Sequence, residues 1–179
     1  MKRYGAVLYE GHNRMGLGTS PNLIALLTGE TEKGDWLDED ERKLIHLVYR
    51  EQGYLTLQME DGAAMENFEN SKFRKPPADI YYRPAFQAIN EATELRCGQI
   101  GTWGNVFQYL QEKSLHEYQF DALHDFIEKY KTTPTFAFLH LHEYTHNDQN
   151  LARLIDEHLS SILGNISNID CKVVVIAMD

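Results

Sequence analysis

Three groups of polar residues in this sequence could carry chemistry, and the first surrounds Thr19. The segment from Asn13 to Asn22 reads Asn-Arg-Met-Gly-Leu-Gly-Thr-Ser-Pro-Asn, which places a hydroxyl residue between a glycine-rich loop and an expected helix. The dipole and the unpaired N–H groups of a helix N-terminus favour an anion, so they would stabilise an alkoxide or a bound phosphate or sulfate. A simpler interpretation is that Thr19 or Ser20 caps the helix, and the local pattern by itself favours this capping role.

The second group follows an expected strand and begins with His140, His142 and Glu143, before His146 and Asp148. Imidazole and carboxylate groups gathered at the end of a buried strand suit zinc or a similar divalent ion. A polar loop with exposed histidines explains the same residues equally well. The third group is Asp179 alone, which follows the run of apolar β-branched residues at 173–176.

The second group also contains His142-Glu143-x-x-His146, the spacing of the zinc proteases. That motif binds zinc only on a helix, where residues four apart share one face. The β-type sequence at 136–139 and the β-formers Tyr144 and Thr145 indicate an extended segment instead. A zinc protease is therefore the less favoured alternative.

The elements that position these groups alternate between strands and helices. Strands are expected at 4–9, 54–57, 135–142 and 173–176, and helices at 21–27, 38–52, 86–95, 107–110, 120–130 and 147–163. Such alternation predicts an α/β fold with a mostly parallel sheet flanked by helices. In such folds the sites lie at the carboxyl ends of the strands, where all three polar groups fall.

Further local patterns give specific expectations. Ser20 is the expected N-cap of the first helix, with Pro21 as its first residue and Gly29 just past its end. In the helix at 38–52, we expect four residues to face inward, namely Leu44, Ile45, Leu47 and Val48. The segment 61–84 has few aliphatic residues and two adjacent prolines, so we expect a long surface loop there.

Composition narrows the classes of function. The chain has 179 residues, enough for one domain over 1–179, and a net charge of −10 from 17 basic and 27 acidic residues. This acidity opposes the phosphate backbone of nucleic acid, so nucleic-acid binding is not expected. The chain contains no run of about 18 apolar residues, so no membrane span is expected in it. Two cysteines, Cys97 and Cys171, leave the redox compartment open.

In their order along the chain, these motifs resemble an animal family of sulfatase-like proteins of unknown function within the alkaline phosphatase superfamily. The family's nucleophile segment reads Gly-x-x-Thr-x-Pro-Asn before an apolar helix that ends Leu-x-Gly. Its later motifs are Gly-Tyr-x-Thr running to Glu-Asp, then Tyr-x-Arg-Pro, then Ser/Thr-His-x-Asp with a helical Asp, and finally Asp-His-Gly. The matching residues are 16–29, 53–61, 81–84, 145–148, Asp156 and Asp179.

The resemblance implies an alkaline-phosphatase-like core in which Thr19 is the nucleophile and Asn22 contacts a non-bridging oxygen of the substrate. It implies a divalent metal, zinc or calcium, with Asp179 and His146 as ligands and with His142 in place of an Asp or Asn. The substrate would be an anionic small molecule or a glycan or lipid ester, and the parent protein would be secreted, lumenal or membrane-anchored.

Three departures from the family pattern concern metal ligands. The upstream Asp, the His that follows Asp179 and a more distant His have no match in this sequence. We therefore expect an incomplete, fragment-like domain that could be inactive. The alternative function is a non-catalytic binding or interaction module on the same fold.

Overall fold

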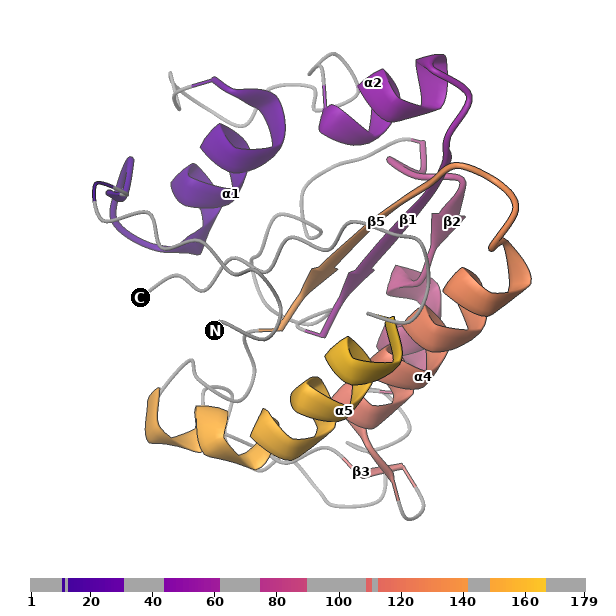
Figure 1. The fold of residues 1–179 in the computed structure, drawn as a ribbon. Coiled ribbons are helices and arrows are strands. Elements are labelled where there is room, and N and C mark those ends of the chain that lie inside the picture. Colours follow the sequence, from indigo (N-terminus) through magenta and orange to yellow (C-terminus); the bar gives the residue numbers. More distant parts are fainter. Residues whose placement is uncertain are drawn as a thin grey trace.

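The fold is organised around a central strand with a parallel neighbour on each side. The computed structural model describes residues 11, 13–30, 44–61, 75–89, 109–110, 113–141 and 149–166 (Figure 1). Strand β1 (Leu55–Glu60) lies between β2 (Ile80–Tyr81) and β5 (Thr135–His140), and both pairs are parallel. With helices on both faces of this sheet, the predicted α/β fold with a parallel sheet is confirmed.

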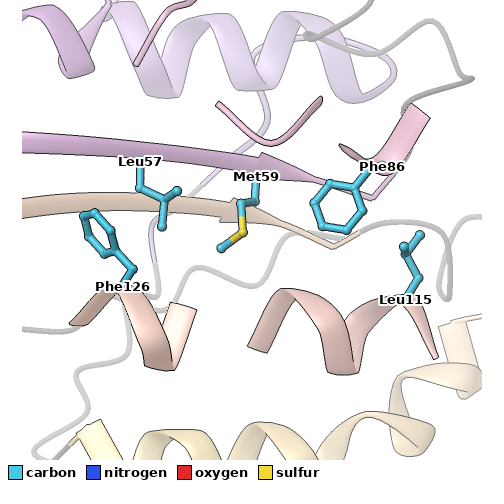
Figure 2. Packing of buried hydrophobic residues seen from close by; sticks show 5 residues of the cluster. All are labelled: Leu57, Met59, Phe86, Leu115 and Phe126. Carbon is cyan, nitrogen blue, oxygen red and sulfur yellow. The ribbon is translucent and has the colours of Figure 1, made fainter. Parts of the chain in front are cut away.

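Side chains of β1 alternate between the two faces of the sheet, as the pleat of a strand requires. On one face, Leu57 and Met59 are buried against Phe86 and against Leu115 and Phe126 of α4 (Leu115–Lys129), as Figure 2 shows. Helix α5 (Asp156–Ile166) packs on α4 through a second cluster of Phe120, Ile162 and Ile166. The expected helix at 120–130 is confirmed, although it begins earlier, at Leu115.

Helices α1 (Thr19–Thr28) and α2 (Ile45–Glu51) form the layer on the other face (Figure 1). Their shared cluster contains Leu23, Ile24, Leu27 and Leu44, and Phe138 of β5 packs against it. The expected end of α1 is confirmed, because Gly29 adopts the left-handed conformation that glycine favours, with φ 73°.

The inward face of α2 differs from the expectation. Val48 is 40% exposed, whereas His46 is fully buried and packs edge-on against Phe136 and Phe138. Neither ring nitrogen of His46 has a hydrogen-bond partner among the residues that the structure describes. A hydrophobic pattern assigns polar residues to the surface, so it could not place a histidine here.

The expected surface loop at 61–84 is wrong for the part that the structure describes. Asp61 and Ala78 are buried, and β2 extends the sheet beside β1. Asp79 explains this placement, since its carboxylate accepts hydrogen bonds from the N–H and the hydroxyl of Thr56 at 3.0 and 2.8 Å. The N–H of Asp79 donates to the same hydroxyl at 3.0 Å.

Two other expected helices also differ. Residues 109–110 form β3 (Tyr109–Leu110), which pairs antiparallel with β4 (Lys113–Ser114), rather than the end of a helix. The helix expected at 147–163 divides into a 3-10 helix, η4 (Gln149–Leu154), and α5. Residues 83–89 are helical, in line with the helix expected from Phe86. The strands expected at 4–9 and 173–176 lie outside the described residues.

No helix within the described ranges is both long and apolar enough to cross a membrane.

Replacing His46 by Leu should stabilise the protein, because the change removes two buried nitrogens that lack partners in the described part of the chain. We expect the free energy of unfolding at neutral pH to rise by about 1 kcal/mol, measured by urea denaturation. The control is His124→Leu on α4, whose half-exposed ring lies beside Asp125. The prediction is wrong if His46→Leu is no more stable than His124→Leu.

His46 should also make stability depend on pH. Burial, with a smaller effect of Arg50, lowers the pKa of His46 to about 4 from an ordinary value of 6.5. Between these values the unfolded chain binds a proton that the folded chain does not, so stability falls as pH falls. The loss should approach about 1.4 kcal/mol per pH unit within that window and be absent in His46→Leu.

Candidate functional site

The glycine-rich loop before α1 is held in place by one side chain, that of Asn22. Its Oδ1 accepts hydrogen bonds from the N–H groups of Met15 and Gly16, at 2.7 and 3.3 Å. Its Nδ2 donates to the carbonyl oxygens of Gly16 and Gly18, at 3.1 and 2.6 Å. Both hydrogens and both lone pairs of the amide are thus engaged. Asn22 fixes the loop directly onto the first turn of α1.

The loop conformation requires glycine at two positions. Gly18 has a φ of 88°, in a region that residues with a Cβ rarely adopt. A Cβ at Gly16 would lie 2.8 Å from Cγ of Pro21, which is too close for two carbon atoms. The backbone of the loop at Gly16 therefore lies directly against the Pro21 ring.

Thr19 is the first residue of α1, and its hydroxyl does not cap the helix. The N-cap is Gly18, which has no side chain, and the cap makes no side-chain hydrogen bond. Thr19 is half-buried, and no hydrogen bond joins its hydroxyl to any part of the chain that the structure describes. The capping interpretation of Thr19 is therefore wrong.

The expected start of this helix is also wrong, since it begins at Thr19 rather than after Ser20. The Asn22 contacts and the positive φ of Gly18 set this earlier start. Pro21 becomes the third helical residue, which costs nothing because first-turn N–H groups have no partner within the helix. These N–H groups and the helix dipole surround Thr19 with partial positive charge.

A buried acid–histidine pair lies where β1 and β5 end. Glu60 and His140 are partners in the strand register, and Oε1 of Glu60 lies 3.0 Å from Nδ1 of His140. Glu60 is 2% exposed and the next residue, Asp61, is 1% exposed. The Asp61 N–H donates to the carbonyl oxygen of His140 at 3.3 Å. The carboxylate keeps a proton on Nδ1 and fixes the orientation of the ring.

The first turn of α4 brings a second polar group to the same edge of the sheet. Ser114 and Glu117 form a capping box, in which the Ser114 N–H donates to the Glu117 carboxylate and the Ser114 oxygen accepts from the Glu117 N–H. The Ser114 hydroxyl also donates to that carboxylate. The ring of His116 lies between Ser114 and His158 of α5, with Nε2 2.9 Å from Nδ1 of His158. Burial and then His158 lower the pKa of His116, while Glu117 and Asp61 act in the opposite direction.

Sequence reasoning placed His140 in the second polar group and Glu60-Asp61 in a family motif, but it did not pair them. It missed the group at Ser114 and His116, although signals for both groups exist. Ser114-x-x-Glu117 before an apolar run is the capping-box pattern. Glu60 and Asp61 follow one strand and His140 ends another, so the carboxyl-end rule could have brought them together.

Helix α1 belongs to the same region as the strand ends. It packs beside β5 through Phe138, two residues before His140. Its N-terminal end is directed toward the side of the sheet at which the β1 and β5 arrows end (Figure 1). Because Glu60 and His140 alternate with the residues that face α4, they point toward the layer of α1 and α2.

The predicted metal ligands His142, His146 and Asp179 lie outside the described residues, so their convergence on Thr19 stays a prediction. The same holds for the zinc-protease spacing at 142–146 and for Cys97 and Cys171. Within the described ranges, no three histidine, cysteine or acidic side chains are placed to hold a metal ion.

Replacing Asn22 by Asp keeps the shape of the side chain but removes both of its donors. A carboxylate would then face the carbonyl oxygens of Gly16 and Gly18, so we expect a loss of about 2 kcal/mol in unfolding free energy. Asn165→Asp on the exposed side of α5 is the matched control and should change stability by less than about 0.5 kcal/mol. Equal effects in denaturant titrations would show that the Asn22 amide does not hold the loop.

Comparison with curated proteins and with solved structures gives no match. A family model does match, with the description "Protein of unknown function (DUF229)", and it covers residues 1–178. Because this match extends over nearly the whole chain, the protein with the Thr19 loop and the Glu60–His140 pair belongs to the DUF229 family.

Proposed function

We propose that this chain provides the nucleophile, Thr19, of a sulfatase-like hydrolase of phosphate or sulfate esters in the alkaline phosphatase superfamily. The observation that carries the proposal is the position of the Thr19 hydroxyl. It lies in the first turn of α1, beside N–H groups without helical partners, and it is not used to cap the helix. A capping role would have removed the main support for a nucleophile.

The proposed chemistry is displacement at phosphorus or sulfur. Oγ1 of Thr19 forms a bond to that atom while the bond to the ester oxygen breaks and the alcohol leaves. Water then releases phosphate or sulfate from the threonine. The N–H groups at the start of α1 are suited to bind the non-bridging oxygens, whose negative charge they stabilise.

Asn22 supports this chemistry by positioning. The resemblance implied a contact between Asn22 and a substrate oxygen, but the amide already makes four contacts with the loop. We therefore assign Asn22 to holding Thr19 and the N–H groups in a fixed geometry. A fixed geometry matters because misplacement by a fraction of an ångström slows an in-line displacement.

A divalent metal, zinc or calcium, is part of the proposal, with His142, His146 and Asp179 as ligands. Such an ion would lower the pKa of the Thr19 hydroxyl and add positive charge to a chain whose net charge is −10. The positive charge of the ion suits an anionic small molecule or a glycan or lipid ester as substrate.

The buried polar residues at the strand ends also support a site at this edge. Burial of Glu60 and Asp61 is costly. The Glu60 carboxylate is hydrogen-bonded to His140, and the charge of Asp61 acts to raise the pKa of His116. Polar residues kept at the carboxyl ends of parallel strands are typical of the sites of α/β proteins.

Thr19→Val tests the proposal, because it removes the hydroxyl and keeps the branched shape. With zinc present, we expect hydrolysis of p-nitrophenyl phosphate or p-nitrophenyl sulfate to fall by about a thousandfold or more. Thr19→Ser should retain part of the activity. Thr28→Val at the other end of α1 is the matched control, since its hydroxyl bonds to the Ile24 carbonyl and lies away from the site.

Binding of orthovanadate, followed by ⁵¹V NMR, gives a readout that does not need turnover. The wild type and Thr28→Val should bind it and Thr19→Val should not. Equal hydrolysis and equal vanadate binding in Thr19→Val and Thr28→Val would contradict the assignment of the nucleophile. Vanadate binding at Thr19 without turnover would favour the non-catalytic module on the same fold.

A further inference from the structure

We propose that the hydrogen bond between His116 and His158 is an acid-sensitive latch, which holds the first turn of α5 against the first turn of α4 and releases it at low pH. The two ring nitrogens, Nε2 of His116 and Nδ1 of His158, are 2.9 Å apart. They join helices that are otherwise held together by the apolar cluster of Phe120, Ile162 and Ile166.

The positions of the protons follow from the surrounding hydrogen bonds. Ser114 has one hydroxyl hydrogen, which it donates to the carboxylate of Glu117. Its oxygen must therefore accept a hydrogen from His116, whose nearer nitrogen is Nδ1, at 3.0 Å. A neutral His116 with its proton on Nδ1 has an acceptor at Nε2, so the proton of the latch lies on Nδ1 of His158.

The hydrogen bond between His116 and His158 can persist when one proton is added to the two rings, but not when two are added. A proton added to Nε2 of His158 leaves the latch intact and faces Oε1 of Glu117, 3.7 Å away. A second proton must go to Nε2 of His116, which is the atom that accepts the latch hydrogen. Two N–H groups would then point at each other across 2.9 Å, and the bond would break.

The groups around the pair set the pH at which this happens. Among the described residues, the charges that act on His116 besides His158 are Glu117 on its own helix and Asp61 just after β1. Burial acts most strongly and lowers the pKa of His116 below its ordinary value of 6.5. The contact is thus complete above about pH 6.5 and is lost as pH falls further, because the open form binds the extra proton.

Release should open the start of α5 without unfolding it. His158 is 47% exposed on its side chain and lies in the first turn, whereas Ile162 and Ile166 remain buried against α4. The start of α5 would move apart from His116 and Glu117 of α4, while its later turns stay docked. Acid would thereby loosen the contact between the first turns of α4 and α5.

Hydrogen exchange of the full chain, followed by NMR, tests the latch. Between about pH 8 and pH 5 we expect the protection factors of amides 158–161 to fall about tenfold, and those of 163–166 to change little. His158→Asn should remove this response, because its amide can donate at neutral pH and can turn to accept from a protonated His116. His124→Asn on the exposed side of α4 is the matched control and should respond as the wild type does.

The ring nitrogens give a second, independent test in the unaltered protein. At about pH 8, ¹H–¹⁵N spectra should show both His116 and His158 with the proton on Nδ1. A proton on Nε2 of His116 at that pH overturns the proposal. An equal loss of protection in His158→Asn and in the wild type also overturns it.

Discussion

The parallel pairing of β1 with β5 is the interaction on which the rest of the structure depends. It runs from Leu55 opposite Thr135 to Glu60 opposite His140, residues that are 80 positions apart in the chain. Because parallel strands end at the same edge, this register gathers the polar ends of both strands. A shift by one residue would turn Leu57 and Met59 away from α4 and carry Glu60 out of reach of His140.

The two helical layers bring different groups to this edge. On the side of α1 and α2 lie Glu60 and His140, with α1 beginning at Thr19 toward the same edge (Figure 1). On the side of α4 and α5 lies the polar group of Ser114, Glu117, His116 and His158. The first set surrounds the nucleophile that we propose, whereas the second joins two helices through a histidine–histidine hydrogen bond. Our two proposals therefore concern the same edge of the sheet, one on each of its faces.

Features that depend on residues close together in the chain could be predicted from the sequence, whereas features that depend on distant residues could not. Local patterns placed α4, the end of α1 at Gly29, and a hydroxyl residue after a glycine-rich loop. The start of α1 was wrong because the Asn22 side chain reaches back six or seven residues to fix the loop. Strand β2 and the buried Glu60–His140 pair depend on contacts between distant segments, which periodicity does not contain.

The most direct test of the central claim, that Thr19 is a nucleophile beside a metal site, is a crystal structure of the chain with zinc and orthovanadate. We expect vanadium within bonding distance of Oγ1 of Thr19, its oxygens at the N–H groups of the first turn of α1, and zinc held by His142, His146 and Asp179. Vanadate bound elsewhere, or zinc held by His142 and His146 on one face of a helix far from Thr19, would contradict it.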